Sequence, residues 1–301
     1  MIDLFGKQGF SGLIKRHIPG STVELSPITL GTMRLSEKKF DTSSTKMLIR
    51  DALAMQVDTH HLSDEYESFE LLLNSYAGLK QTEKSQIKSI CKLGNPHFDE
   101  ELFNAEKLKL QIESYLTSTG LEQLSIVQWM WRLNPLDDSV RIERLKNCIQ
   151  EMKESFQLLI KEGKVGDFAC FPYSSDFMHE VRDLNLCKGQ VNYLNLAEDD
   201  ALDAGLGEYT IALRPLLAGK LKTIKDQNML KYIEGVANGK QWTLSQHSLA
   251  YCLSASEVKT CVVSMHNLEQ LKSATEVATS TPSSLDLNSY QKLISAVSTY
   301  Y

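Results

Sequence analysis

Lys92 is the residue whose setting points most clearly to chemistry. It ends the apolar run 86–93, where a charged group must be paired or solvated, and this favours a functional site over a core position. His60 and His61 close another apolar run, and adjacent residues on a strand point to opposite faces. Residues 129–132 (Trp-Met-Trp-Arg) close a third run and could shape a pocket for a flat or sugar-like ligand. The sequence therefore predicts a site assembled from the ends of several strands.

The six cysteines are interpreted as structural. They lie at positions 91, 148, 170, 187, 252 and 261 and form no CxxC pair. Several are inside apolar runs, which is typical of reduced, mostly buried thiols in a cytosolic protein. The same spacing predicts no metal site.

The elements that position these residues alternate between short apolar runs and longer segments with helical period. The strand candidates are 28–33, 57–61, 86–93, 124–131, 165–171, 190–196, 209–216 and 260–265. Helical patterns include 44–55, 101–116 and the amphipathic 142–163, which ends at a glycine. Repeated β-then-α units predict parallel strands, and about eight of them fit a closed (β/α)8 TIM barrel better than an open sheet.

The chain is expected to form a single domain over residues 1–301. Two glycine-centred breaks precede residue 28 and predict an N-terminal hairpin that caps the barrel floor. Residues 273–284 are predicted to be a loop before a last helix. No GxGxxG turn follows the first strand, so a Rossmann fold has no support.

Composition narrows the class of partners. The formal net charge is −6 and the pI is near 5.7, whereas nucleic-acid binding normally shows a basic stripe. No run approaches the roughly 20 apolar residues of a membrane helix, and the N-terminus lacks the apolar core of a signal peptide. We expect a cytoplasmic monomer or weak homo-oligomer that binds neither nucleic acid nor membrane and acts on a small molecule.

Motifs in a consistent order give the chain a resemblance to the aldo-keto reductases. They are LSPITLGTMRLS (25–36), DALAMQVDTHHLSDEY (51–66), SICKLG (89–94), KEGKVGDFACFPYSSDF (161–177), GQVNYLNL (189–196), RPLLAGKL (214–221) and VVSMHNLEQLKSA (262–274). Each motif is weak alone, but their order and spacing together are fairly specific for the fold.

The resemblance implies reduction of a carbonyl with NADPH or NADH by a Tyr-Lys-Asp-His tetrad. Hydride transfer places negative charge on the carbonyl oxygen, so a proton donor must lie within hydrogen-bond reach. Tyrosine, with a pKa of about 10, is too weak an acid unaided, and a neighbouring lysine stabilises the phenolate.

Two alignments place the tetrad differently. Counting from Ala52 puts Tyr66 at the tyrosine, Lys92 at the lysine and His61 at the aspartate, and this is the alignment we prefer. Anchoring on Asp58 instead places Ser63 at the tyrosine.

Met130 stands where the family histidine is usual, so with His61 two of the four catalytic identities are changed. Lys92 then needs another carboxylate, namely Asp58, Asp64 or Glu65, or its pKa should fall. His97 and Asp99, in the loop after Lys92, are interpreted as solvated.

The resemblance also implies a set of cofactor-binding residues. They are Gly31, Thr32, Gln190, Arg214, Leu216, Ala218, Ser264, His266 and Gln270. The usual Ser-Asn pair is replaced by Phe171-Pro172, the stacking aromatic by Leu213, and a phosphate-binding arginine by His266. Nicotinamide binding is therefore weakened, shifted towards NADH, or lost.

Three hypotheses follow from these departures. The protein is an NAD(P)H-dependent carbonyl reductase with a modified tetrad, a barrel with changed non-redox acid–base chemistry, or a non-catalytic ligand- or partner-binding barrel. The retained tyrosine and lysine favour the first two, and the altered nicotinamide site favours the last two. The first is preferred.

Overall fold

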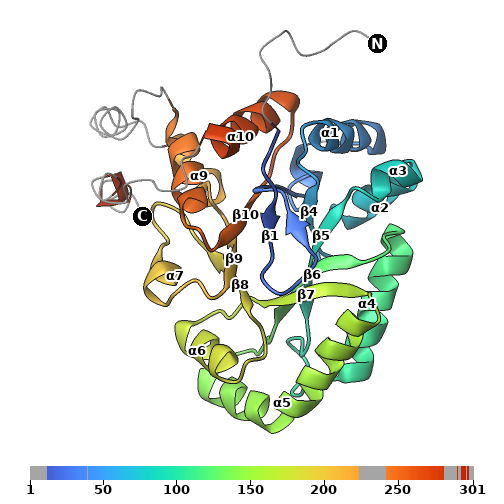
Figure 1. Cartoon of the computed structure of the whole chain (residues 1–301), viewed down its shortest axis with the longest axis vertical. Helices are drawn as coiled ribbons and strands as arrows, with labels where there is room; N and C mark the ends of the chain where they lie inside the picture. Colours follow the sequence, from blue (N-terminus) through green and yellow to red (C-terminus); the bar gives the residue numbers. More distant parts are fainter. Residues whose placement is uncertain are drawn as a thin grey trace.

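Eight parallel strands close into a barrel in the computed structural model, which describes residues 12–38, 40–223, 242–280, 290, 293–295 and 297 (Figure 1). Around the barrel the strands follow the order β10-β3-β4-β5-β6-β7-β8-β9. Their bounds are β3 (Ile28–Gly31), β4 (Thr59–Leu62), β5 (Lys88–Gly94), β6 (Leu124–Met130), β7 (Val165–Cys170), β8 (Gly189–Tyr193), β9 (Tyr209–Leu213) and β10 (Val258–Val263). Each overlaps one predicted strand, so the (β/α)8 barrel is confirmed.

Helices surround the barrel and connect successive strands (Figure 1). Their bounds are α1 (Thr42–Ala54), α2 (Phe69–Ala77), α3 (Gln81–Lys84), α4 (Ala105–Thr119), α5 (Asp138–Lys161), α6 (Ser175–Asp183), α7 (Asp200–Asp203), α9 (Leu244–Ser254) and α10 (Leu268–Ser280), with 3-10 turns η1 (Ser36–Lys38) and η2 (Leu217–Thr223). The side chains of Asp41, Asn104 and Asp137 each accept a backbone N–H at a helix start, which explains where α1, α4 and α5 begin.

One predicted loop is helical instead. Residues 273–280 form the second half of α10, whereas 281–284 lie outside the described residues. Leu271, Ala274 and Val277 are buried at a spacing of three residues, which gives α10 an apolar face despite its serines and threonines.

The predicted N-terminal hairpin is confirmed at the amino end of the barrel. Its strands β1 (Arg16–His17) and β2 (Glu24–Leu25) pair antiparallel. Val23 packs into the cluster that fills the barrel. A Cβ on Gly166 of β7 would lie 2.4 Å from Val23 and 2.5 Å from the Ser125 carbonyl oxygen, so this position requires glycine. The hairpin thus covers the floor and leaves chemistry to the opposite end, called the mouth below.

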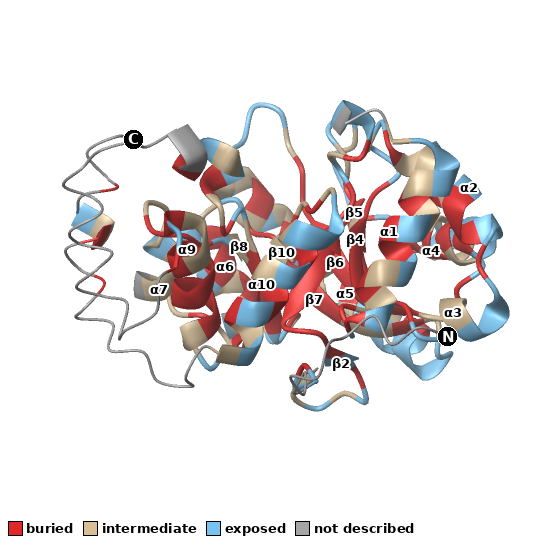
Figure 2. Cartoon of the chain, turned by 90° about the horizontal axis from the view of Figure 1, so that it is seen from above, coloured by how far each residue is buried: buried red, intermediate tan, exposed pale blue. Residues whose placement is uncertain are grey.

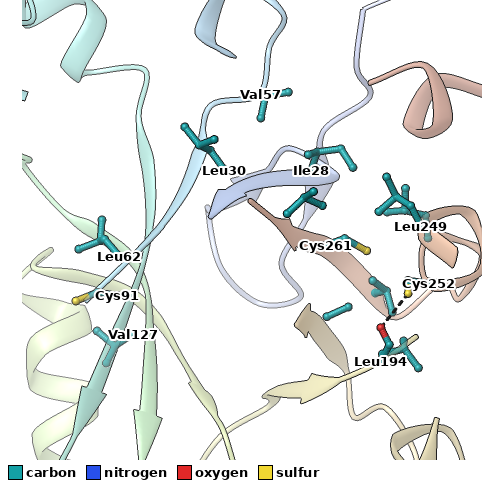
Figure 3. Packing of buried hydrophobic residues seen from close by; sticks show 14 of the residues in the cluster. Ile28, Leu30, Val57, Leu62, Cys91, Val127, Leu194, Leu249, Cys252 and Cys261 are labelled. Carbon is teal, nitrogen blue, oxygen red and sulfur yellow. Dashed lines mark hydrogen bonds between the residues drawn. The ribbon is translucent and has the colours of Figure 1, made fainter. Parts of the chain in front are cut away.

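Alternation along each strand separates an inner from an outer layer. Ile90, Ile126 and Val191 belong to the cluster inside the barrel. The residues next to them face the helices; Figure 3 shows Leu62, Cys91 and Val127 among those in the outer cluster. Burial is concentrated on the strands and on the helix faces turned towards them (Figure 2). Residues two positions apart on a strand therefore face the same side of the barrel. This alternation determines which side chains reach the mouth.

Candidate active site

The mouth brings together the four residues predicted to be catalytic. His61 lies on the inner face of β4 and Lys92 on that of β5, where Lys92 pairs with Gln128 of β6. Met130 ends β6 in the interior cluster. Tyr66 lies in the loop after β4 and directs its hydroxyl back to His61.

That loop is held at both ends. The Ser68 hydroxyl donates to the Thr32 carbonyl oxygen at 2.8 Å, and the Tyr115 hydroxyl of α4 donates to Asp64 Oδ1 at 2.5 Å. Thr32 in turn donates its hydroxyl to the His61 carbonyl oxygen at 2.8 Å. Thr32 therefore supports the backbone that carries His61 and Tyr66.

Tyr66, His61 and Gln128 form a chain of hydrogen bonds. The Tyr66 hydroxyl is 3.2 Å from His61 Nδ1, and His61 Nε2 is 2.8 Å from Gln128 Oε1. Because the amide oxygen can only accept, Nε2 carries the proton and Nδ1 accepts from Tyr66. Burial, together with the nearby Lys92 charge, lowers the pKa of His61 to about 4 although Gln128 opposes the shift. The imidazole is therefore neutral near pH 7.

The electrostatic setting of Tyr66 favours its protonated form. Burial raises the Tyr66 pKa well above its ordinary value of 10, and the negative charge of Glu65 adds to the shift. The Lys92 ammonium lies over the Tyr66 ring, 5.4 Å from its centroid, and a cation in this position stabilises a phenolate. Tyr66 thus holds its proton firmly, and the positive charges of Lys92 and Arg132 nearby partly compensate for the loss of that proton.

Glu65 provides the counter-ion that Lys92 was expected to need. Its Oε2 lies 2.6 Å from Lys92 Nζ, and Arg132 donates to both of its carboxylate oxygens. Burial alone would raise the Glu65 pKa, but the hydrogen bonds and charges of Arg132 and Lys92 outweigh it and hold the pKa at about 2. The expectation of a compensating carboxylate is confirmed, with Glu65 in that role.

The other two carboxylate candidates lie elsewhere. Asp58 precedes β4 at the floor and pairs with Lys15 at 2.5 Å, while Asp64 is engaged by Tyr115. Ser63, the tyrosine equivalent in the second alignment, is buried and accepts the Glu65 N–H. Tyr66 contacts both His61 and Lys92, and the alignment that starts from Ala52 stays the preferred prediction.

Met130 packs in a wall of aromatic and polar groups. Its sulfur is 3.7 Å from the Tyr173 hydroxyl and 3.8 Å from Gln128 Nε2. Phe171 contacts the Tyr173 and Tyr193 rings with centroid distances of 4.8 and 5.3 Å. A thioether is only a weak acceptor, so Met130 shapes the site rather than transferring protons.

Only part of the Trp-Met-Trp-Arg group reaches the mouth. Trp129 and Trp131 belong to the outer cluster, and Trp129 Nε1 donates to the Asn95 carbonyl oxygen at 2.7 Å. Met130 and Arg132 alternate with them onto the inner side. Trp129 and Trp131 are therefore packing residues, because the alternation turns both indoles towards the helices, and any pocket shaped by this group involves Met130 and Arg132.

Gln190 does not lie at the mouth with Tyr66 and Lys92. It is the second residue of β8, close to the floor, and its Nε2 donates to the Gly205 carbonyl oxygen at 2.7 Å and to Thr210 Oγ1 at 3.2 Å. The neighbouring Gly189 faces inward, where a Cβ would lie 2.0 Å from the Tyr209 ring. Gln190 therefore points into the helix layer, which corrects its expected position at the mouth.

The remaining predicted cofactor residues lie at or after the carboxyl ends of β3, β9 and β10, with Gly31 ending β3 and Gln270 inside α10. A Cβ on Gly31 would lie 3.2 Å from Ser264 Oγ, so the ends of β3 and β10 approach closely there. The Arg214 guanidinium stacks 3.9 Å from the Tyr193 ring centroid and pairs with Glu198 at 3.6 Å.

The segment after Arg214 has an unusual backbone. Leu217, Ala218 and Gly219 have φ values of 53°, 53° and 89°, the left-handed region. The N–H groups of Leu217 and Gly219 donate to the carbonyl oxygens of Arg214 and Leu216. On the next loop, the His266 N–H donates to Gln270 Oε1 at 2.7 Å.

Four participants were given no catalytic or cofactor-binding role from the sequence, although Arg132 was named in the 129–132 group. Arg132 and Gln128 lie two residues either side of Met130, so the strand period could have identified them. His97 was interpreted as solvated, yet its Nε2 lies 2.8 Å from Arg132 Nη1. Tyr173, whose hydroxyl accepts from Arg132 Nε at 3.2 Å, reaches the site from a loop that no period predicts.

Comparisons with known proteins identify the family. A sequence model of the Aldo/keto reductase family matches residues 27–294, so the chain belongs to this family of oxidoreductases. Two solved structures similar to this chain are the holo and apo forms of the aldo-keto reductase AKR11C1 from Bacillus halodurans. The holo form has a TM-score of 0.72 at 16% identity, and the apo form 0.66 at 14%. Both comparisons cover 93% of this chain and 96% of the other.

No curated protein sequence matches the chain significantly. Within the described ranges, no helix is long and apolar enough to cross a membrane.

Proposed function

We propose that the protein is an NAD(P)H-dependent reductase of aldehydes or ketones in which Tyr66 donates the proton. The observation that carries the proposal is the Tyr66 hydroxyl at the mouth, 3.2 Å from His61 Nδ1 and with the Lys92 ammonium 5.4 Å from its ring centroid. A carbonyl oxygen that gains negative charge needs a nearby proton donor, and Tyr66 is protonated at neutral pH. Its raised pKa makes it a weaker acid, so donation depends on the positive charges of Lys92 and Arg132 nearby.

His61 would orient the donor. In the aligned position a carboxylate is usual, and here a neutral imidazole accepts the Tyr66 hydrogen bond while Gln128 fixes its tautomer. To donate, the hydroxyl must rotate from Nδ1 to the substrate oxygen. The phenolate that results faces Lys92, whose charge is shared with Glu65. These residues therefore support proton donation by Tyr66. Because Lys92 is also paired with Glu65, it stabilises the phenolate less than a lysine without a counter-ion would.

The nicotinamide nucleotide, when bound, would supply the hydride. Among the described residues, backbone at the mouth could meet its phosphates, whereas its carboxamide end finds few donors. The close approach of Gly31 to Ser264, and the turn at Leu217–Gly219, place backbone at the mouth on neighbouring loops. At the carboxamide end Phe171 and Pro172 offer no side-chain donors, and Gln190 points away. We propose weak binding with little preference between NADPH and NADH.

A second candidate is a barrel without redox chemistry, either an acid–base enzyme or a ligand- or partner-binding protein. The missing carboxamide donors favour it, as does the pairing of both Lys92 and Arg132 with one carboxylate. A location in the cytoplasm and a monomeric or weakly oligomeric state are kept as predictions under either candidate.

Titration of the purified protein with NADPH and NADH, followed by fluorescence, separates the two candidates. Binding of either nucleotide, followed by its oxidation when an aldehyde panel is added, would support the reductase. If neither nucleotide binds, the non-redox candidate replaces it.

A further inference from the structure

Positive charge exceeds negative charge around Glu65. Lys92 and Arg132 both contact this single carboxylate, and His97 Nε2 lies 3.3 Å from it. The Arg132 side chain is only 5% exposed, and a guanidinium so buried requires an anionic partner. Glu65 is 31% exposed and comes from a loop rather than a strand. The cations are therefore fixed on the barrel, and the anion is the more accessible member.

We infer that Lys92 and Arg132 form a carboxylate-binding site and that the substrate is a carbonyl compound bearing a carboxylate. In the protein without substrate, the side chain of Glu65 occupies this site. The choice of substrate class rests on the proposed function, whereas the binding site itself does not. A bound carboxylate would either share the site with Glu65 or displace its side chain.

Geometry favours a carboxylate over other anions. Arg132 uses Nη1 and Nη2 on the two oxygens of Glu65, the fork arrangement that matches a planar carboxylate. Two basic side chains and one carboxylate leave one net positive charge. An arriving carboxylate would therefore neutralise the cluster.

The same cluster is directly connected to the proton donor. Glu65 precedes Tyr66 in the chain, and Lys92 contacts both. A molecule whose carboxylate takes the place of Glu65 would thus place its remaining atoms next to the Tyr66 hydroxyl.

Aromatic side chains border the site and favour a flat molecule. The Arg132 guanidinium lies 5.0 Å from the Phe98 ring centroid, and its Nε donates to the Tyr173 hydroxyl. Phe98 and Tyr173 are 47% and 40% exposed, which leaves their rings available for contact. A suitable probe is therefore an aromatic aldehyde with a carboxylate on the ring.

The test compares 4-carboxybenzaldehyde with its methyl ester, which keeps the aldehyde but loses the charge. Binding is measured by calorimetry without nucleotide on wild type, Arg132→Gln, Glu65→Gln and the control Arg50→Gln. Arg50 also donates to both oxygens of a glutamate, Glu83, but on the outer helices. The control therefore removes an equivalent charge and pair away from the mouth. Turnover of both aldehydes with NADPH and NADH is measured in parallel.

We expect the acid to bind about tenfold or more tightly than the ester, in line with a charge-assisted contact. Arg132→Gln should remove this preference, and Arg50→Gln should keep it. Glu65→Gln should tighten binding of the acid about tenfold, because the competing anion is gone, and should leave the ester unchanged. In turnover the preference should lie mainly in KM.

Equal binding of acid and ester by wild type would overturn the inference, as would an unchanged preference in Arg132→Gln. Weaker binding of the acid by Glu65→Gln would also overturn it, because Glu65 would then be part of the receptor and not its internal occupant. If Arg132→Gln fails to fold, Glu65→Gln still decides the matter. Selective acid binding without turnover by either nucleotide would remove the proposed reductase function but keep the carboxylate site.

Discussion

The Tyr66 hydroxyl and His61 Nδ1 face each other at 3.2 Å inside the barrel, and directly behind them Tyr76 and His60 form a second such pair at 2.7 Å. The first pair faces the mouth and the second faces α2, because consecutive residues of β4 alternate sides. Two pairs of the same chemistry thus occupy the two faces of one strand.

This duplication provides a matched control for the proton donor. If the protein is a reductase, Tyr66→Phe should lower kcat about 100-fold or more, in line with typical general-acid contributions, and change KM less. Tyr76→Phe removes an equivalent hydroxyl from the outer pair and should leave kcat within about twofold of wild type. Steady-state aldehyde reduction measures both. Full activity in Tyr66→Phe would rule out Tyr66 as the donor.

Glu65 should set the acidity of Tyr66. Its negative charge contributes to the raised Tyr66 pKa, so Glu65→Gln should lower that pKa and shift the ionisation of Tyr66 to lower pH. Ultraviolet difference titration, with Tyr66→Phe subtracted to isolate the signal, measures the shift. The control is Glu83→Gln, which breaks the equivalent ion pair on the outer helices. A Tyr66 ionisation that stays in place or moves to higher pH in Glu65→Gln would contradict this account.

Gln190 should matter for stability and not for the cofactor. Its amide is fully buried and bonded to Gly205 and Thr210, so Gln190→Ala should lower the free energy of unfolding by about 1–3 kcal/mol. Nucleotide affinity should not change. Urea denaturation and fluorescence titration of the same variant give the two numbers. Normal stability with a large loss of affinity would show that Gln190 acts at the mouth after all.

His60 should make the fold sensitive to acid. Burial lowers its pKa to about 3, below the unfolded value of about 6.5. The unfolded chain therefore binds more protons between these values, and stability falls as pH drops from about 6.5 towards 3.

Urea denaturation near pH 7 and near pH 5 tests this. Wild type should lose about 2 kcal/mol more than His60→Asn over that interval. His17 is exposed, so the variant His17→Asn serves as the control and should behave like wild type. Equal losses in wild type and His60→Asn would show that His60 is protonated in the folded protein.

The strands and the contact between Tyr66 and Lys92 could be predicted because both depend on local patterns. Apolar runs separated by helical segments predicted the eight strands, and spacing from Ala52 predicted that Tyr66 and Lys92 would meet at one end. Gln190 was misplaced because a motif match carries no information about which face of the strand a residue takes. The adjacent Gly189, which must face inward below Tyr209, determines that choice through a contact 20 residues away.

The ion cluster around Glu65 was only partly predictable. Glu65 could be named as one of three counter-ions because it lies near Tyr66 in the chain. Arg132 and His97 contact it across 67 and 32 residues of sequence, and only the closure of the barrel brings those segments together. Long-range pairing of charged side chains leaves no periodic signal in a sequence.

The back-to-back pairs on β4 have a consequence for how this protein tolerates change. Substituting His60 or His61 alters one side of the strand, whereas inserting or deleting a single residue before them would exchange their sides. The His61 imidazole would then face α2, and the His60 imidazole would face the barrel interior. Both hydroxyl partners would be lost in one step, so the length of β4 should be under stricter selection than the identity of either histidine.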